Sequence, residues 1–262
     1  MPLPRPLRAA VPFAAAAALA ACASSPRMMH DHGAMPATPA GASSNTSSGA
    51  NMAGLPADAA GAAARLAASP RHGEYAMIRV GDDSVRAWVV YPERATKAPV
   101  VVVVHEIFGL SAWVRAVADQ LAADGFIAVA PDLLTGKMGN GHPDSLDVQA
   151  AVAQIRQLDP AEVQRRLAGL ARWAMALPAA APRYGIVGFC WGGSTSFEHA
   201  VASLALGTEL GAAVVYYGSS PATATLSTVR APVLGLYGGD DARVNATVPA
   251  ADSALRALGR TF

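Results

Sequence analysis

The stretch YGIVGFCWGG, residues 184–193, decides the fold, because it joins an apolar run to a glycine-flanked turn and then to a helix-forming segment. Its first four residues make up the apolar run, and Cys190 lies in the turn between Gly188 and Gly192. Small residues flank the central residue of such a turn because the strained backbone leaves no room for side chains. The stretch therefore predicts a strand, a nucleophile elbow and a helix, with a cysteine thiol held exposed at the edge of a sheet.

The segments around this stretch alternate between strand and helix character. A β-hairpin is indicated by residues 74–80 and 84–91, which flank the turn-forming Gly81-Asp82-Asp83. The five valines at 100–104 are typical of a central strand that is covered on both faces. Further strands are expected at residues 126–130, 212–217 and 233–237, and helices after Ser111, from residue 145 and after Asp159. This order predicts an α/β fold with a mostly parallel, doubly wound sheet and with functional sites at the carboxyl ends of its strands.

Two helix starts are explicit in the sequence. Ser111 is a residue type that caps helices, and Val114, Val117 and Leu121 follow it on one helical face. Residues Asp159-Pro160-Ala161-Glu162 combine a capping aspartate, a proline at the first helical position and an acid at the third. We expect helices to begin at both places.

The composition of the chain limits the classes of molecule that it is expected to bind. The chain has 262 residues, of which 20 are basic and 19 acidic, and no run of Lys or Arg is long enough to suggest a nucleic-acid surface. Small molecules are therefore the expected partners, and we expect no cofactor and no nucleic acid. The first seventy or so residues differ in composition from the rest, which leaves roughly 190 residues for one folded domain.

The N-terminus has the features of an export signal. Arg5 and Arg8 precede the apolar residues 9–21, a stretch far shorter than the ~20 residues that span a bilayer. The stretch ends in Leu19-Ala20-Ala21-Cys22, which resembles the lipobox of bacterial lipoproteins. This resemblance implies cleavage after residue 21, acylation of Cys22 and a membrane anchor, with Ala23 favouring the outer membrane and a periplasmic domain. An ordinary secretory signal is the alternative.

Residues 22–70 are dominated by Ala, Gly, Ser and Pro and predict a disordered tether to a folded domain at residues 71–262. Within the tether, Met28-Met29-His30-Asp31-His32 and Met35 bring together side chains that bind copper. Because these residues lack a regular spacing, a solvated linker that happens to contain them is the simpler interpretation. Copper capture remains a separate hypothesis for the function.

Three motifs, each at the end of its own strand, carry a family resemblance. They are VVVHEIFG at 102–109, GFCWGG at 188–193 and YGGDD at 237–241. With these motifs in this order, the chain resembles the dienelactone hydrolase family of α/β-hydrolases from about Glu74 to its last residue. The resemblance implies an α/β-hydrolase fold and hydrolysis of a small ester or lactone.

The resemblance also implies a role for each site residue. Cys190 is expected to be the nucleophile, Glu106 the acid that contacts the resting thiol, and Asp241 the acid that orients the triad histidine. The backbone N–H groups of Ile107 and Trp191 are expected to form the oxyanion hole. The alternatives are an inert packing cysteine at 190, a solvated or ion-paired acid at 106 and a turn residue at 241.

The sequence departs from the family pattern at the histidine. In this fold the catalytic histidine follows the acid, yet no histidine follows Asp241 and the chain ends 21 residues later. We therefore expect the last strand and helix to be missing, with poor stability as a result. His199 lies nine positions beyond Cys190, about 13 Å along a helix, too far to replace the base. His105 and His142 remain as weaker candidates.

Two functions from different classes follow. The first is a lipid-anchored hydrolase that acts on a small ester or lactone through a cysteine acyl-enzyme, with its activity in doubt because the histidine is absent. The second is a non-catalytic ligand-binding lipoprotein that retains the hydrolase cleft. Dienelactone itself is not favoured, because residues 145–158 hold no confident match for an arginine that would bind its carboxylate.

Overall fold

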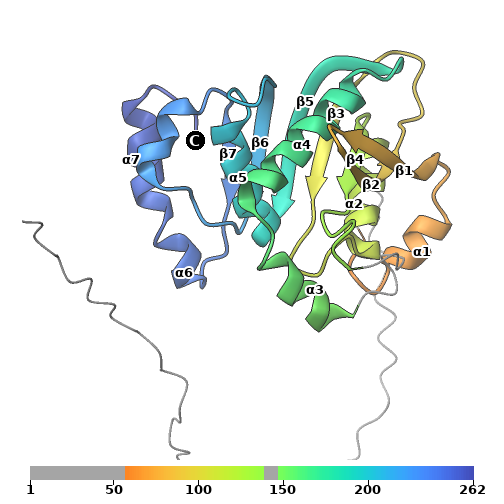
Figure 1. Cartoon of the computed structure of the whole chain (residues 1–262), viewed down its shortest axis with the longest axis horizontal. Helices are drawn as coiled ribbons and strands as arrows, with labels where there is room; N and C mark the ends of the chain where they lie inside the picture. The colour runs from red at the N-terminus through yellow and green to blue at the C-terminus, as the bar shows by residue number, and fades with distance from the viewer. Residues whose placement is uncertain (1–56, 139–146) are drawn as a thin grey trace, which may run out of the picture. The chain divides into compact units, whose positions relative to one another are not determined.

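The computed structural model describes residues 57–138 and 147–262, which contain a seven-stranded sheet flanked by helices (Figure 1). The strands are β1 (Gly73–Val80), β2 (Asp83–Val90), β3 (Ala98–Val104), β4 (Ile127–Pro131), β5 (Ala180–Phe189), β6 (Leu210–Tyr216) and β7 (Val233–Leu236). The helices are α1 (Ala62–Ala67), α2 (Ala112–Ala123), α3 (Val148–Ile155), α4 (Pro160–Met175), α5 (Trp191–Ala202), η2 (Thr223–Thr228, 3-10), α6 (Ala242–Asn245) and α7 (Val248–Ala257).

The strand order is β1-β2-β4-β3-β5-β6-β7. β1 pairs with β2 and β2 with β4 in antiparallel fashion, whereas the other four pairings are parallel. This confirms the expected hairpin followed by a mostly parallel sheet. The parallel arrangement brings the carboxyl ends of β3, β5, β6 and β7 to one edge, where ligands bind in open α/β sheets.

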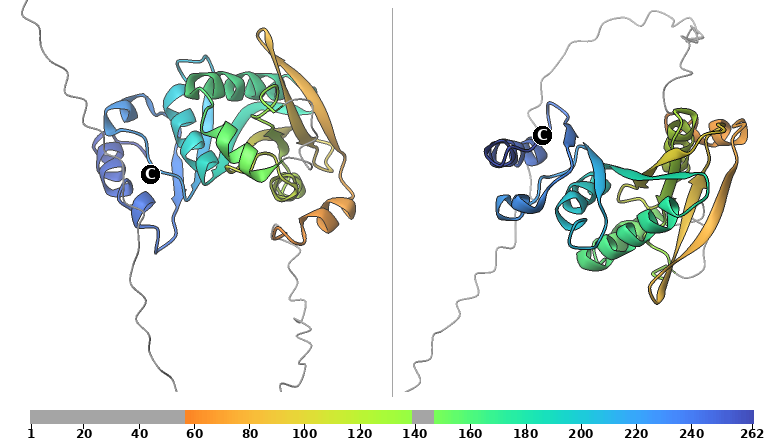
Figure 2. Two further views of the ribbon diagram at one scale, coloured as in Figure 1. Left: turned by 60° about the horizontal axis from the view of Figure 1, so that its bottom comes forward. Right: turned by 90° about the horizontal axis from the view of Figure 1, so that it is seen from above.

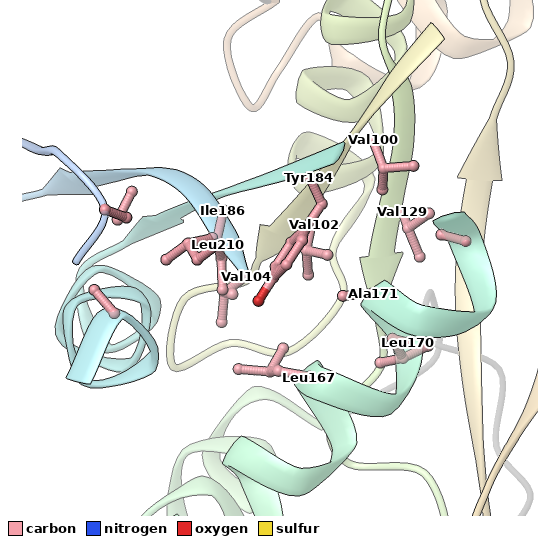
Figure 3. Packing of buried hydrophobic residues seen from close by; sticks show 14 of the residues in the cluster. Val100, Val102, Val104, Val129, Leu167, Leu170, Ala171, Tyr184, Ile186 and Leu210 are labelled. Carbon is pink, nitrogen blue, oxygen red and sulfur yellow. The ribbon is translucent and has the colours of Figure 1, made fainter. Parts of the chain in front are cut away.

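Helices cover both faces of the sheet. α4 packs on β1, β3 and β5 and α5 on β5 and β6, whereas α2 packs on β2, β3 and β4 from the other side (Figure 2). The valine run is buried from both sides, since Val102 and Val104 belong to the cluster under α4 and Val103 to the cluster under α2. Figure 3 shows how Leu167 and Leu170 of α4 meet the valines of β3.

Both explicit helix starts are confirmed. The Ser111 hydroxyl accepts a hydrogen bond from the N–H of Val114 at the start of α2, and the Asp159 carboxylate accepts one from Ala161 at the start of α4. The helix expected from residue 145 begins later, at Val148, because Asp147 provides its cap; residue 145 itself lies outside the described residues.

The end of the expected tether, residues 22–70, contains a helix. α1 lies within this range and packs on α2, although the composition of the range predicts disorder. Asp119 of α2 holds the segment that contains α1 in place. It is 1% exposed and pairs with Arg65 at 3.2 Å and with Arg71 at 2.7 Å. Ser69 also donates a hydrogen bond to this carboxylate. The expected signal peptide at 1–21, Cys22 and the Met/His cluster at 28–35 lie outside the described residues.

β7 is the edge strand of the described sheet. Leu234 is 56% exposed and Leu236 37% exposed, and both lie on the face of the sheet that α2 covers further along. No helix in the part of the chain that the structure describes is long and apolar enough to cross a membrane.

Candidate active site

The turn after β5 has the geometry expected of an elbow. Cys190 adopts φ 56° and ψ −117°, a backbone conformation that residues with a side chain rarely adopt. Its N–H donates to the carbonyl of Tyr216 on β6 at 3.0 Å, and its own carbonyl accepts from Ser194 at 3.1 Å. α5 begins directly after it. The cysteine therefore lies at the tip of a sharp strand-to-helix turn.

Glycines bring the elbow against β3. A Cβ atom on Gly192 would lie 2.4 Å from the carbonyl oxygens of Val104 and His105, and one on Gly188 would lie 2.0 Å from the carbonyl oxygen of Gly192. These are backbone atoms, which cannot move aside cheaply. Because these glycines have no side chains, the turn can pack against the end of β3. Glu106 follows β3 in the chain and therefore lies next to the turn.

The Cys190 side chain is partly exposed. Its sulfur makes no hydrogen bond with any residue that the structure describes. The residues before it on β5, from Ile186 to Phe189, are buried and anchor the turn. Cys190 is therefore not fully buried in the core.

Glu106 lies in the loop after β3 and is partly buried. Its carboxylate oxygen Oε1 accepts a hydrogen bond of 2.9 Å from the hydroxyl of Tyr217, which follows β6. The family resemblance implies a contact between Glu106 and the thiol, but here the observed partner is a tyrosine 111 positions away in the chain. Sequence reasoning missed Tyr217. Its position at the end of the strand next to the elbow strand was the available signal.

Tyr217 is held in an unusual environment. Burial, the hydrogen bond to Glu106 and the nearby charges of Glu106 and Cys190 raise the pKa of its hydroxyl above the ordinary value. The hydroxyl therefore stays protonated and remains a hydrogen-bond donor at neutral pH.

Two N–H groups are available for an oxyanion. Trp191 is the first residue of α5, where backbone N–H groups have no partner within the helix, and Ile107 lies in the loop after Glu106. Neither N–H donates a hydrogen bond within the described residues. An oxyanion hole requires N–H groups that are not already bonded within the protein.

Asp241 caps a short helix. Its Oδ1 accepts a hydrogen bond of 3.0 Å from the N–H of Val244 at the start of α6. Asn245 donates to the carbonyl of Gly238 at 2.8 Å and fixes the loop between β7 and α6. Asp240 is exposed in the turn before it. No contact joins Asp241 to Cys190 in the described structure.

The two buried histidines are engaged elsewhere. His105 has Nδ1 at 2.7 Å from the Glu106 carbonyl, accepts from the N–H of Leu133 at Nε2, and stacks on the Trp191 ring at 5.6 Å. Burial lowers its pKa, so the neutral ring with a proton on Nδ1 satisfies both contacts. It is thus a structural residue under the elbow.

His199 lies within α5 between Gln164 and Tyr184, at 2.8 Å from the first and 3.1 Å from the second. Burial lowers its pKa to about 4, so it is neutral at pH 7. Neither buried histidine contacts the thiol, in agreement with the expectation that His199 lies too far away. His142 lies outside the described residues. The described residues contain no cluster of His, Cys, Asp and Glu that could hold a metal ion.

The chain is similar in sequence to proteins of one family. The family model that matches is described as the dienelactone hydrolase family and covers residues 85–262. A Salmonella typhimurium protein predicted to be a carboxymethylenebutenolidase is 34% identical over 191 residues, or 68% of each chain. An Escherichia coli K12 protein of the same description is 32% identical over 172 residues, or 61% of each chain.

Solved structures agree. The crystal structure of a predicted dienelactone hydrolase from Klebsiella pneumoniae has 31% identity and a TM-score of 0.63, over 73% of this chain and 82% of that one. The dienelactone hydrolase-like promiscuous phosphotriesterase P91 from metagenomic libraries has 25% identity and a TM-score of 0.62, over 72% of this chain and 78% of that one. The chain therefore belongs to the dienelactone hydrolase family and has its α/β-hydrolase fold.

Proposed function

We propose that this chain is a hydrolase that cleaves a small ester or lactone through an acyl-enzyme on Cys190. The observation that carries the proposal is the elbow, because Cys190 combines a left-handed backbone with a partly exposed side chain at the end of β5. A cysteine that only filled space would need neither the strained conformation nor the flanking glycines.

The chemistry proceeds in two half-reactions. In the first, the sulfur of Cys190 forms a bond to the carbonyl carbon, the C–O bond to the alcohol breaks, and the alcohol takes up a proton. In the second, water attacks the thioester, the acid is released and the thiol is restored. The N–H groups of Ile107 and Trp191 stabilise the negative charge that forms on the carbonyl oxygen in both halves.

We propose that Asp241 orients a base. One oxygen of its carboxylate caps α6, which leaves the other oxygen to accept a hydrogen bond from that base. The sequence holds no histidine after Asp241, and neither His105 nor His199 bonds to the thiol. We therefore expect these 262 residues to be acylated by an activated ester but to lose the acyl group slowly. The oxyanion hole and substrate binding alone retain part of the acceleration when a base is lacking.

Hydrolysis of p-nitrophenyl acetate tests the proposal. A burst of about one nitrophenolate per chain, followed by a slow steady rate, is expected, because acylation precedes the slow step. Cys190→Ala should remove the burst and lower the residual rate by about 10³-fold. A burst of unchanged size in Cys190→Ala, with circular dichroism equal to that of the natural chain, would contradict the proposal.

Ligand binding without turnover is the second candidate, and the engagement of both buried histidines favours it. In that case a non-hydrolysable aryl carboxylate should bind equally well to the natural chain and to Cys190→Ala, and neither should give a burst. Isothermal titration of the two proteins separates this candidate from the first.

We also propose, from the residues alone, that Cys22 carries lipid and anchors the domain to a membrane on its periplasmic side. Expression in bacteria fed radiolabelled palmitate should label the natural chain and transfer it to the membrane fraction. Cys22→Ala should lose both properties, and a label that survives this substitution would contradict the anchor.

A further inference from the structure

Two adjacent residues, the last of β6 and the one that follows it, contact the two sides of the site. The carbonyl of Tyr216 accepts the N–H of Cys190, and the hydroxyl of Tyr217 donates to Glu106 at 2.9 Å. Tyr217 is itself fixed, because its N–H donates to the carbonyl of Leu236 at 2.8 Å. Cys190 and Tyr217 are the two non-glycine residues with a positive φ in the described structure, at 56° and 41°. Tyr217, on a strained backbone, thus places its hydroxyl against the Glu106 carboxylate.

We infer that Tyr217 is a positioning residue that holds the Glu106 carboxylate, so that this carboxylate accepts from the tyrosine and not from the Cys190 thiol. The inference deepens the proposed function, because it names the residue that sets how readily the nucleophile ionises. It does not require turnover, since the ionisation of a thiol can be measured by its reactivity alone.

The physical argument compares two acceptor states of one carboxylate. A carboxylate that accepts from a thiol stabilises the protonated thiol and repels the thiolate, and both effects raise the thiol pKa. A carboxylate that accepts a hydrogen bond from a tyrosine hydroxyl has part of its charge neutralised by that donor. Its oxygens are also held in a different orientation from the one that accepts from the thiol. Removal of the tyrosine hydroxyl therefore frees the Glu106 carboxylate to accept a hydrogen bond from another donor.

The other titratable groups at this edge of the sheet do not replace Tyr217. His105 follows β3, but its ring nitrogens bond the backbone of Glu106 and Leu133. Asp132 follows β4 and pairs with Arg86 at 2.8 Å. Asp240 and Asp241 follow β7 and occupy a turn and a helix cap. Among the described contacts of the Glu106 side chain, the Tyr217 hydroxyl is the one hydrogen bond.

The test is the pH dependence of alkylation of Cys190 by iodoacetamide, followed by the mass of the peptide that contains it. Tyr217→Phe frees the carboxylate to turn to the thiol, so the midpoint of the alkylation profile should rise by about one pH unit, with up to about tenfold slower alkylation below the midpoint. Glu106→Gln removes the charge and should lower the midpoint. In the double variant, Tyr217→Phe should have no further effect.

Tyr91→Phe is the matched control, because it removes a tyrosine hydroxyl that donates to a different carboxylate, that of Glu74, at 3.4 Å. Its midpoint should equal that of the natural chain. A Tyr217→Phe midpoint that does not rise, or a rise that persists in the Glu106→Gln background, overturns the inference. Loss of the burst with an intact midpoint shift would instead count against the proposed hydrolysis alone.

Discussion

At the scale of single residues, the site depends on conformations that its own residues do not favour. A non-glycine residue in a sparsely populated region costs roughly 1–3 kcal/mol, so the surroundings must hold it there. Cys190 is held through the Tyr216 carbonyl and Tyr217 through the Leu236 carbonyl. In each case the carbonyl belongs to the neighbouring parallel strand. The position of Cys190 therefore depends on the register of β5, β6 and β7.

Gly192→Ala should destabilise the protein by about 2–4 kcal/mol, because its Cβ would meet the carbonyl oxygens of Val104 and His105 at 2.4 Å. Urea unfolding followed by circular dichroism measures the loss. Gly238→Ala is the matched control, since a Cβ there meets nothing within 4 Å. Equal losses in the two variants would contradict close packing of the elbow on β3.

The sequence located Cys190 and Glu106 but not the hydrogen bond between Tyr217 and Glu106. A motif places a residue at the end of a strand, which is local information. The bond joins residues 111 positions apart through the angles of two loops, and no local pattern determines those angles.

At the scale of elements, α1 is attached to the domain by charge. Burial alone would raise the pKa of the Asp119 carboxyl, but hydrogen bonds from Arg71, Ser69 and Arg65 and the charge of Arg71 hold it below its ordinary value. A pKa that is lowered by folding stabilises the protein above the pKa of the unfolded chain. This stabilisation is lost as the pH falls through the folded value.

Asp119→Asn should cost about 2–4 kcal/mol at pH 7, because it leaves two guanidinium groups without their buried partner. The difference from the natural chain should shrink as the pH falls below about 4, the ordinary pKa of the carboxyl, toward the lower folded pKa, because the natural carboxyl then also becomes protonated. Urea unfolding over this range measures it. Asp252→Asn breaks the exposed pair with Arg256 and should leave the free energy of unfolding almost unchanged, because solvent screens exposed ion pairs. A pH-independent cost at Asp119 would contradict the ionic attachment.

The elements whose sequence signals lie within a few residues could be predicted from the sequence, whereas α1 could not. The caps at Ser111 and Asp159 and the valine run of β3 each act within a few residues, so the sequence shows them directly. Arg65 meets Asp119 54 positions away, and its own surroundings are rich in alanine and glycine. Composition therefore predicted a tether where a distant carboxylate fixes a helix.

At the scale of the whole molecule, one face of the sheet remains apolar past the strands that α2 covers. Strand register aligns Val187, Val214 and Leu234 in one row and Phe189, Tyr216 and Leu236 in the next. A groove of about 630 Å³ lies on the same face and is lined by residues of β3, β5 and β6. Exposed apolar surface of this kind, at a sheet edge, favours association with other apolar surfaces.

We expect the 262-residue chain to self-associate at micromolar concentration, because Leu234 and Leu236 are exposed side by side on the edge strand. Leu234→Ser combined with Leu236→Ser should shift the sedimentation profile toward the monomer. Leu258→Ser removes a leucine of similar exposure, 44%, at the end of α7 and should leave the profile unchanged. Equal effects of the two changes would exclude the sheet face as the cause.

The central claim, that the Cys190 thiol acts as an acyl acceptor, is tested most directly by mass spectrometry of the chain after brief treatment with p-nitrophenyl acetate. The account predicts one acetyl group on the peptide that contains Cys190, formed before any reaction at other nucleophiles and absent from Cys190→Ala and from protein unfolded in urea. Acetylation of the folded and unfolded chains at the same rate, or at residues other than Cys190, would contradict it.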